Sequence, residues 1–477
     1  MKKKLIVFIL LGLLGISLGV QSVTQAEDVE QVTEPVVEEV VDESIDGEAS
    51  DSMETGKPKR SLAQSNETRT IELQKFYIET TDGAADSVSV PFPNTNYKLH
   101  YSKDGKETFL SEGVTNEKGE ILNFKLEGIP SEGAALRVRY YLGNENRGFV
   151  QKFNKNHYGF VFTLRLIDHK QTINYINTKA RFGNTVDPDS YFYNFQAARI
   201  NCYFDQAVTE YTEAVKQANQ LLPESSRFEL KPINMNFEKG KHIGGSAFCR
   251  RGYDQSGVSD IVIGNHSTGI YTDYYLKRVV MHEWTHWNMY QATGMPGGVY
   301  EDHYSFNPNP QTSYKEGWAI FVADMFRKNY ENEKHDKVVQ TVEYNRFYGK
   351  SVNLTVYHVL YDLLDTGTND ESFSVSQRYL DEELSDQETR QLNLGMLHTA
   401  MVESKATTLQ GLLNYLENKY VLTASDKEKF AQLLEVNGLS RDGNFTLDGD
   451  GNPLAAPMMV PVITEEVDVW ENESDDF

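Results

Sequence analysis

The chain has 477 residues, and 46 Lys and Arg against 70 Asp and Glu give a formal net charge of −24. This acidic balance excludes broad electrostatic binding to nucleic acid or anionic lipid, because both require a positive protein surface. Two cysteines exclude a disulfide-dense scaffold, a zinc ribbon and an iron–sulfur protein. The 27 Tyr and 24 Phe are enough for a large core, so we expect a folded protein with no nucleic-acid partner.

The N-terminus predicts the compartment. Three lysines at positions 2–4 precede an apolar stretch from Leu5 to Val20, and Thr24 and Ala26 stand at the −3 and −1 positions of a cleavage site. This order is typical of a secretory signal peptide over residues 1–26. The alternative is an uncleaved anchor, for which the apolar run is short. We expect a secreted, extracellular or cell-surface protein with no membrane partner after signal removal.

Two acidic segments flank the rest of the chain. Glu27 to Glu54 holds twelve acidic residues and no basic one, and Thr464 to Phe477 holds seven acidic residues. Segments of high charge and low hydrophobicity cannot build a core. We therefore predict a disordered acidic leader over residues 27–70 and an acidic tail over residues 441–477, and whether the leader is an inhibitory pro-segment is left open.

Residues 71–165 have a β pattern. Apolar positions alternate in 71–73 and 97–101, and turn residues follow at 103–105, 117–120 and 143–146. Short strands between such turns predict a small antiparallel sandwich. The stretch from Pro93 to Phe124 resembles transthyretin-like or carboxypeptidase-regulatory-like modules.

The pattern becomes helical after about residue 170. Apolar residues follow helical spacing from Asn194 to Leu222, strands are expected at 228–237 and 260–264, and helices dominate to about residue 437. Strands followed by helices predict an α+β fold, with a second domain over residues 166–440.

A metal-binding motif lies in a helical stretch from Tyr271 to Gln291. His282-Glu283-x-x-His286 places two imidazoles four residues apart, on one face of a helix, where both reach one metal ion. Neutral imidazoles suit Zn²⁺, and Glu283 can take a proton from a metal-bound water. The alternative is a surface helix that carries two histidines by chance.

A catalytic zinc site requires a third ligand. The metzincin pattern is excluded because Met289 and Ala292 stand where it has Gly and His. Glu316 lies 30 residues after His286, at the predicted start of an apolar-periodic helix. Ser313-x-x-Glu316 is also a capping-box pattern, and His303, in a loop rich in Gly, Pro and Asn, is a competing ligand.

The His282-Glu283-x-x-His286 and Glu316-Gly317-x-Ala319 motifs resemble the gluzincin metallopeptidases, most closely the bacterial collagenase branch and related secreted bacterial proteins. The resemblance covers about residues 190–370. It implies a zinc helix packed against a sheet with an antiparallel edge strand, followed by a helical subdomain. It also implies one Zn²⁺ per chain, with Glu283 as the catalytic base and a protein or peptide as substrate.

The resemblance also implies two further features of the site. The edge strand, which would pair with the substrate backbone, corresponds to Ser246, Ala247 and Phe248. Many gluzincins stabilise the oxyanion with a Tyr or His beyond the third ligand. The candidates are Tyr357, His358 and Tyr361, each of which has buried helix packing as its alternative.

Weaker patterns leave alternatives open. Cys202 and Cys249 could form a disulfide in an oxidising compartment or stay two buried thiols. Asp448-Gly449-Asp450-Gly451-Asn452 begins like a calcium loop, but Met459 stands where an EF-hand has Glu, so calcium is unsupported and a turn is expected. Three tryptophans near the motifs could line a pocket or the core: Trp284, Trp287 and Trp318.

These observations predict a secreted zinc metalloendopeptidase. One alternative is a surface or adhesion protein whose peptidase fold is inactive, although the presence of Glu283 argues against it. Another is a zinc hydrolase that acts on a different bond, because water activation does not specify peptides.

Overall fold

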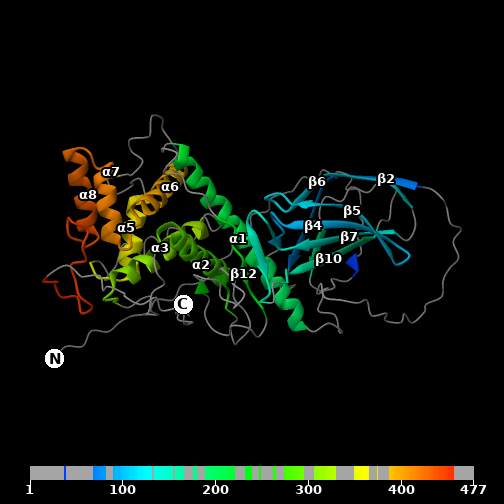
Figure 1. The fold of residues 1–477 in the computed structure, drawn as a ribbon, viewed down its shortest axis with the longest axis horizontal. Coiled ribbons are helices and arrows are strands. Elements are labelled where there is room, and N and C mark those ends of the chain that lie inside the picture. Colours follow the sequence, from blue (N-terminus) through cyan, green and yellow to red (C-terminus); the bar gives the residue numbers. More distant parts are fainter. Residues whose placement is uncertain are drawn as a thin grey trace, which may run out of the picture. The chain divides into compact units, whose positions relative to one another are not determined.

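The computed structural model describes a set of ranges along the chain: 37–38, 68–81, 90–130, 134–153, 156–165, 176–179, 188–220, 231–238, 247–248, 261–264, 273–294, 306–328, 349–364, 373 and 386–455. The chain divides into Met1–Val36 and Val37–Phe477, and all described residues lie in the second unit. Strands dominate the earlier part and helices the later part (Figure 1). The predicted α+β class is confirmed.

The first sheet is antiparallel throughout, in the order β1-β10-β7-β4-β5. Its strands are β1 (Val37–Glu38), β4 (Asn96–Lys103), β5 (Lys106–Val114), β7 (Ala134–Tyr141) and β10 (Gly159–Arg165). Asp104 and Gly105, with φ of 50° and 75°, join β4 to β5 as a two-residue hairpin turn. β1 lies inside the leader that we predicted to be disordered, so this two-residue pairing differs from the prediction.

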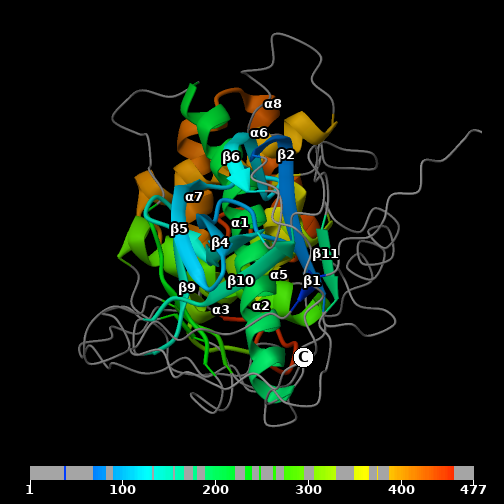
Figure 2. The same ribbon diagram turned by 90° about the vertical axis from the view of Figure 1, so that its right-hand side faces the viewer.

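The second sheet packs against the first. Its strands are β2 (Thr68–Thr81), β3 (Val90–Pro91), β6 (Glu120–Pro130) and β11 (Ile176–Lys179). The other three strands all pair with β2: β3 and β6 are antiparallel to it and β11 is parallel. Phe92, which follows β3, stacks on Tyr140 of β7 with ring centroids 4.9 Å apart and meets Phe160 of β10 edge-on at 5.1 Å. These buried rings join two sheets into a sandwich, which Figure 2 shows from its end.

A third sheet crosses the predicted domain boundary at residue 165. Its strands pair in the order β13-β14-β12-β9-β8. They are β8 (Gly143–Asn144), β9 (Gly148–Gln151), β12 (Met235–Asn236), β13 (Ala247–Phe248) and β14 (Ile261–Val262). β9 pairs in parallel with β12, with Val150 opposite Met235. The residues 143–151, which the sequence analysis assigned to the sandwich, therefore belong to the sheet of the helical part.

The helices form one buried core. Those described are α1 (Pro188–Gln220), α2 (Asp273–Thr293), α3 (Pro310–Lys328), α5 (Asn353–Leu364), α6 (Asp386–Ser404), α7 (Leu409–Tyr420) and α8 (Ala424–Val436). α2 contacts α1, α3 and α6, and α3 also contacts α5. The helices predicted at 194–222 and 271–291 correspond to α1 and α2 and are confirmed within the described residues.

Two glycines allow close helix crossings. A Cβ on Gly317 of α3 would lie 2.4 Å from Val356 Cβ of α5, and a Cβ on Gly395 of α6 would lie 2.2 Å from the Ala214 carbonyl oxygen of α1. Contacts this short are repulsive, because non-bonded heavy atoms prefer about 3.5–4.0 Å. Glycine at these positions therefore sets the distance between α3 and α5 and between α6 and α1.

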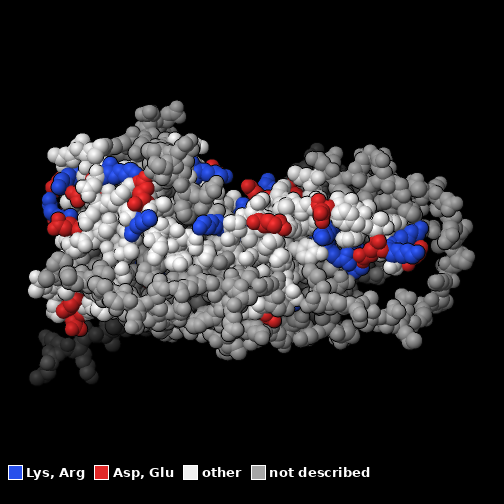
Figure 3. Space-filling view, viewed as in Figure 1, with Lys and Arg blue, Asp and Glu red and all other residues white. Residues whose placement is uncertain are grey.

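The first fifteen residues of the predicted acidic tail belong to the folded body. Residues 441–455 form turns, with β-bridges between Leu439 and Phe445 and between Lys350 and Leu447. Phe445 is buried in the core cluster, so burial of its ring extends the fold past residue 440. On the face drawn in Figure 3, described Lys and Arg side chains are interspersed with Asp and Glu.

Candidate metal centre

α2 carries the first two candidate ligands and is buried along most of its length. His282, Glu283 and His286 are 1–3 % exposed. Polar neighbours on the helix are satisfied locally, since Thr285 donates to the Met281 carbonyl at 2.8 Å and Asn288 donates to the Trp284 carbonyl at 2.9 Å. The helix can therefore be buried without leaving these polar groups unpaired.

α3 carries the third ligand in its interior. Asn309 begins the helix, because its side-chain oxygen accepts from the Gln311 N–H at 3.0 Å and Pro310 occupies the first helical position. Glu316 therefore lies almost two turns inside α3, and the predicted helix start was wrong. Ser313 is also inside the helix and its hydroxyl bonds to that of Ser351 at 2.9 Å, which excludes the capping-box alternative for Glu316.

The three side chains converge on one point. Glu316 Oε2 lies 3.3 Å from His282 Nε2 and 3.3 Å from His286 Nε2, and the two Nε2 atoms are 2.8 Å apart. The imidazole planes are nearly perpendicular, at 86°. One ligand atom from each residue lies within 4.8 Å of the others, and all three residues are buried, so the group could hold a metal ion.

Lys315 is a part of the site that the sequence analysis missed. It is 4 % exposed, and its Nζ lies 3.3 Å from Glu316 Oε1, whereas Glu316 Oε2 is the oxygen that lies 3.3 Å from both histidines. A lysine directly before Glu316, ahead of a run from Gly317 to Phe326 that is mostly apolar, was the available signal. Lysines are seldom fully buried unless they are paired.

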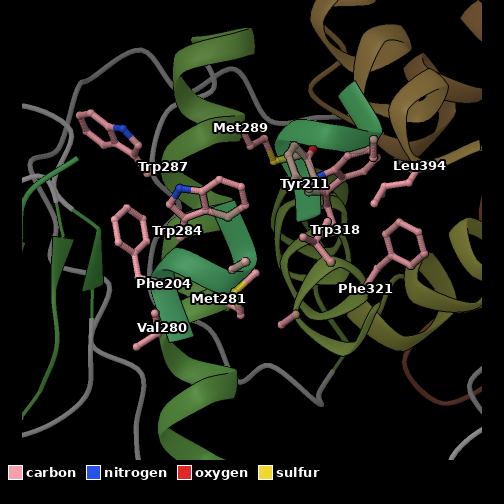
Figure 4. Packing of buried hydrophobic residues seen from close by; sticks show 14 of the residues in the cluster. Phe204, Tyr211, Val280, Met281, Trp284, Trp287, Met289, Trp318, Phe321 and Leu394 are labelled. Carbon is pink, nitrogen blue, oxygen red and sulfur yellow. The ribbon is translucent and has the colours of Figure 1, made fainter. Parts of the chain in front are cut away.

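A layer of buried aromatic side chains packs around α2, the helix that carries His282 and His286 (Figure 4). Tyr211 of α1 meets the Trp284 ring edge-on at 5.1 Å, and its hydroxyl hydrogen-bonds His398 Nδ1 of α6. Burial lowers the pKa of His398 to about 3, so its imidazole is neutral at pH 7. Trp284 and Trp318 are fully buried and Trp287 nearly so, so all three tryptophans belong to the core.

The predicted edge strand lies at an end of the third sheet. Ala247 and Phe248 form β13, which pairs antiparallel with β14 and contacts α2. Ser246 lies outside the described residues, as does the competing ligand His303. Within the described strands β13 has one partner, so its other edge faces away from the sheet.

The three oxyanion candidates are buried in α5. Tyr357 meets Phe321 of α3 edge-on at 6.5 Å and stacks with Tyr361 at 6.1 Å, and its ring also meets that of His358 at 5.6 Å. Burial of all three residues agrees with helix packing. The contact between Tyr357 and Phe321 joins α5 to α3.

The weaker patterns have separate outcomes. Cys202 is buried in α1 and Cys249 lies outside the described residues, so the disulfide stays a prediction. Asp448 forms a turn, because its Oδ1 accepts from the Asn452 N–H at 2.8 Å and its Oδ2 accepts from the Asn452 side chain at 3.2 Å. These hydrogen bonds lower the pKa of the exposed Asp448 carboxyl and agree with the predicted turn.

Comparisons with known proteins add little. No family model and no curated protein matches the chain. One solved structure with local similarity is a putative carbohydrate-binding protein from Pseudomonas aeruginosa, at 15 % identity and a TM-score of 0.14, over 24 % of this chain and 92 % of that one. Another is a 9R-lipoxygenase from Cyanothece, at 12 % identity and a TM-score of 0.14, over 35 % of this chain and 29 % of the lipoxygenase. Similarities this low carry no argument about function.

Proposed function

We propose that the chain is a secreted zinc metallopeptidase of the gluzincin type. The observation that carries the proposal is the buried group of His282, His286 and Glu316, whose ligand atoms lie within 4.8 Å of one another. Two imidazoles and a carboxylate are the donor set of catalytic zinc sites in peptidases, which keep a fourth position open.

The separations of the ligand atoms are compatible with a tetrahedral zinc ion. Atoms bound about 2.0–2.1 Å from a tetrahedral zinc ion lie roughly 3.3 Å from one another. Glu316 Oε2 lies 3.3 Å from Nε2 of each histidine. The two Nε2 atoms are 2.8 Å apart, which is shorter than the tetrahedral value by about half an ångström. A small rotation of either ring opens this last distance, so the residues fit the ion.

The residues of the site have two roles in the proposed reaction, as metal ligands and as a general base. When bound, zinc lowers the pKa of a water and polarises a carbonyl group. Glu283, directly after His282 on α2 and buried with it, is the general base that takes the proton of the attacking water and returns it to the leaving amine. His282, His286 and Glu316 serve as ligands.

A peptide substrate is favoured over other hydrolysable groups by β13. An extended peptide can add to the open edge of a sheet through main-chain hydrogen bonds. β13 lies at the end of the third sheet and contacts α2, which carries Glu283. A backbone paired there would run beside the ligand helix.

Export is the part of the proposal that rests on residues 1–26 alone. Within the described residues no helix is long and apolar enough to cross a membrane. The signal-peptide pattern supports release of the mature chain outside the cell.

The test is cleavage of an unfolded protein by the zinc-loaded mature chain and by Glu283→Gln. The variant keeps the side-chain shape and the three ligands, so we expect zinc at one per chain and a loss of about 10²–10⁴-fold in kcat. Glu112→Gln, at an exposed glutamate on β5, is the matched control and should cleave like the wild type. Zinc-loaded wild type that cleaves no peptide bond would shift the assignment to the inactive surface protein or to another hydrolase.

A further inference from the structure

Lys315 is a buried cation beside the three candidate metal ligands, and metal binding alone does not account for it. Its side chain is 6 % exposed and directly precedes the third ligand. Burial of an ammonium group costs several kcal/mol unless it is paired, and a residue at this position of α3 could have been apolar like the rest of the core. A cation beside a site for a divalent cation also opposes metal binding, because like charges repel.

The two oxygens of Glu316 have different neighbours. Oε2 lies 3.3 Å from both His282 Nε2 and His286 Nε2, whereas Oε1 lies 3.3 Å from Lys315 Nζ. A carboxylate can bind a metal ion through one oxygen or through both. With the ammonium group at Oε1, the oxygen available to the metal is Oε2.

We infer that Lys315 is a positioning residue that keeps Glu316 a one-oxygen ligand and so preserves the coordination position that a water needs. The inference rests on the proposed metal site and deepens it. Catalytic sites have three protein ligands and an open position, and a second oxygen from Glu316 would compete for that position. Lys315 touches neither water nor substrate in this role and acts through Glu316.

The inference predicts that activity and metal affinity respond in different directions. Lys315→Met removes the ammonium group from Oε1 and a positive charge from the site. Metal affinity should therefore stay equal or rise, while kcat falls by about 10–100-fold, the usual effect of losing a partner of a metal ligand. A residue that only supports the local fold would lower both.

The experiment substitutes Co²⁺ into the full mature chain and records its visible absorption, which is stronger for four-coordinate than for five-coordinate cobalt. Lys315→Met should change the spectrum from the four-coordinate to the five-coordinate type, with an equal or higher affinity in a chelator competition. Lys315→Arg keeps a cation and should retain the wild-type spectrum. Lys350→Met is the matched control, because Lys350 Nζ donates to the Gly449 carbonyl at 3.0 Å, apart from the ligands.

An unchanged cobalt spectrum in Lys315→Met, or a loss of cobalt affinity without a spectral change, would overturn the role of Lys315. Lys315→Ala, which adds no bulk, replaces Lys315→Met if circular dichroism shows that the latter does not fold. The spectra need no turnover, so wild type that binds cobalt but cleaves nothing would refute the peptidase proposal while the comparison still decides Lys315. Wild type that binds no cobalt would overturn both.

Discussion

Gly317 offers the sharpest test of how the fold positions the third ligand. In Gly317→Ala, the new methyl would lie 2.4 Å from Val356 Cβ and 2.6 Å from the Asn353 carbonyl oxygen. Both are atoms that no side-chain rotation can move. α3 and α5 must therefore separate by roughly 1 Å to restore ordinary contact distances.

Two opposing effects determine the change in the free energy of unfolding of Gly317→Ala. Overpacking a core costs about 1–3 kcal/mol, and the rigid neighbours place Gly317 at the upper end. Alanine in place of a helical glycine returns about 1 kcal/mol. We expect a net loss of about 2 kcal/mol in the free energy of unfolding, with a weaker metal site because Glu316 moves with its helix.

Urea unfolding of the metal-free protein, followed by tryptophan fluorescence, measures the loss in the free energy of unfolding. Gly411→Ala is the matched control, since its Cβ would meet Ala406 Cβ and Thr408 Oγ1 at 3.4 Å, an ordinary contact. Gly395→Ala should destabilise like Gly317→Ala, through the contact with Ala214, but leave metal affinity unchanged. If Gly317→Ala unfolds at the same urea concentration as Gly411→Ala, the argument from the α3–α5 distance is refuted.

Three further predictions concern a buried carboxyl, a hydrogen bond and a ligand. Burial raises the pKa of Asp205 to about 6 against the opposing effect of its ion pair with Arg147, whose Nη1 lies 2.7 Å from Oδ1. The unfolded pKa is near 3.9, so the stabilising contribution of the protonated carboxyl is full below about pH 4 and is lost as pH rises through 6. Urea unfolding should show the wild type losing up to about 3 kcal/mol relative to Asp205→Asn between pH 4 and 7, and parallel pH curves would contradict this. Tyr211→Phe removes the hydroxyl bonded to His398 and should cost about 1–3 kcal/mol in thermal unfolding, whereas a change below about 0.5 kcal/mol would mean that the bond is unimportant. Zinc at 100 times its Kd should stabilise the wild type by about 2.7 kcal/mol and His286→Ala by none, and equal stabilisation of both would exclude His286 as a ligand.

Local patterns predicted the helices well because helical periodicity depends on near neighbours. The spacing of His282 and His286 was enough to place two imidazoles on one face of α2. The start of α3 was misplaced because the apolar periodicity begins only at Trp318, whereas Asn309 and Pro310 begin the helix earlier.

Features that depend on distant partners could not be predicted. The parallel pairing of β9 with β12 joins residues some 85 positions apart, and no pattern within β9 indicates its partner. The proximity of Lys315 Nζ to Glu316 Oε1 depends on side-chain rotamers, and the need for Gly317 depends on where α5 crosses α3.

The pairing of β9 with β12 has a consequence for biosynthesis. Because the ribosome makes β9 long before β12, the nascent chain must carry a strand with an open edge until residues 235–236 emerge. An open strand edge can pair with other chains, so this interval is a hazard for aggregation. A truncated chain that ends after the sandwich would keep that edge open permanently, and its solubility should recover when an internal deletion also removes residues 143–151, which lie between β7 and β10.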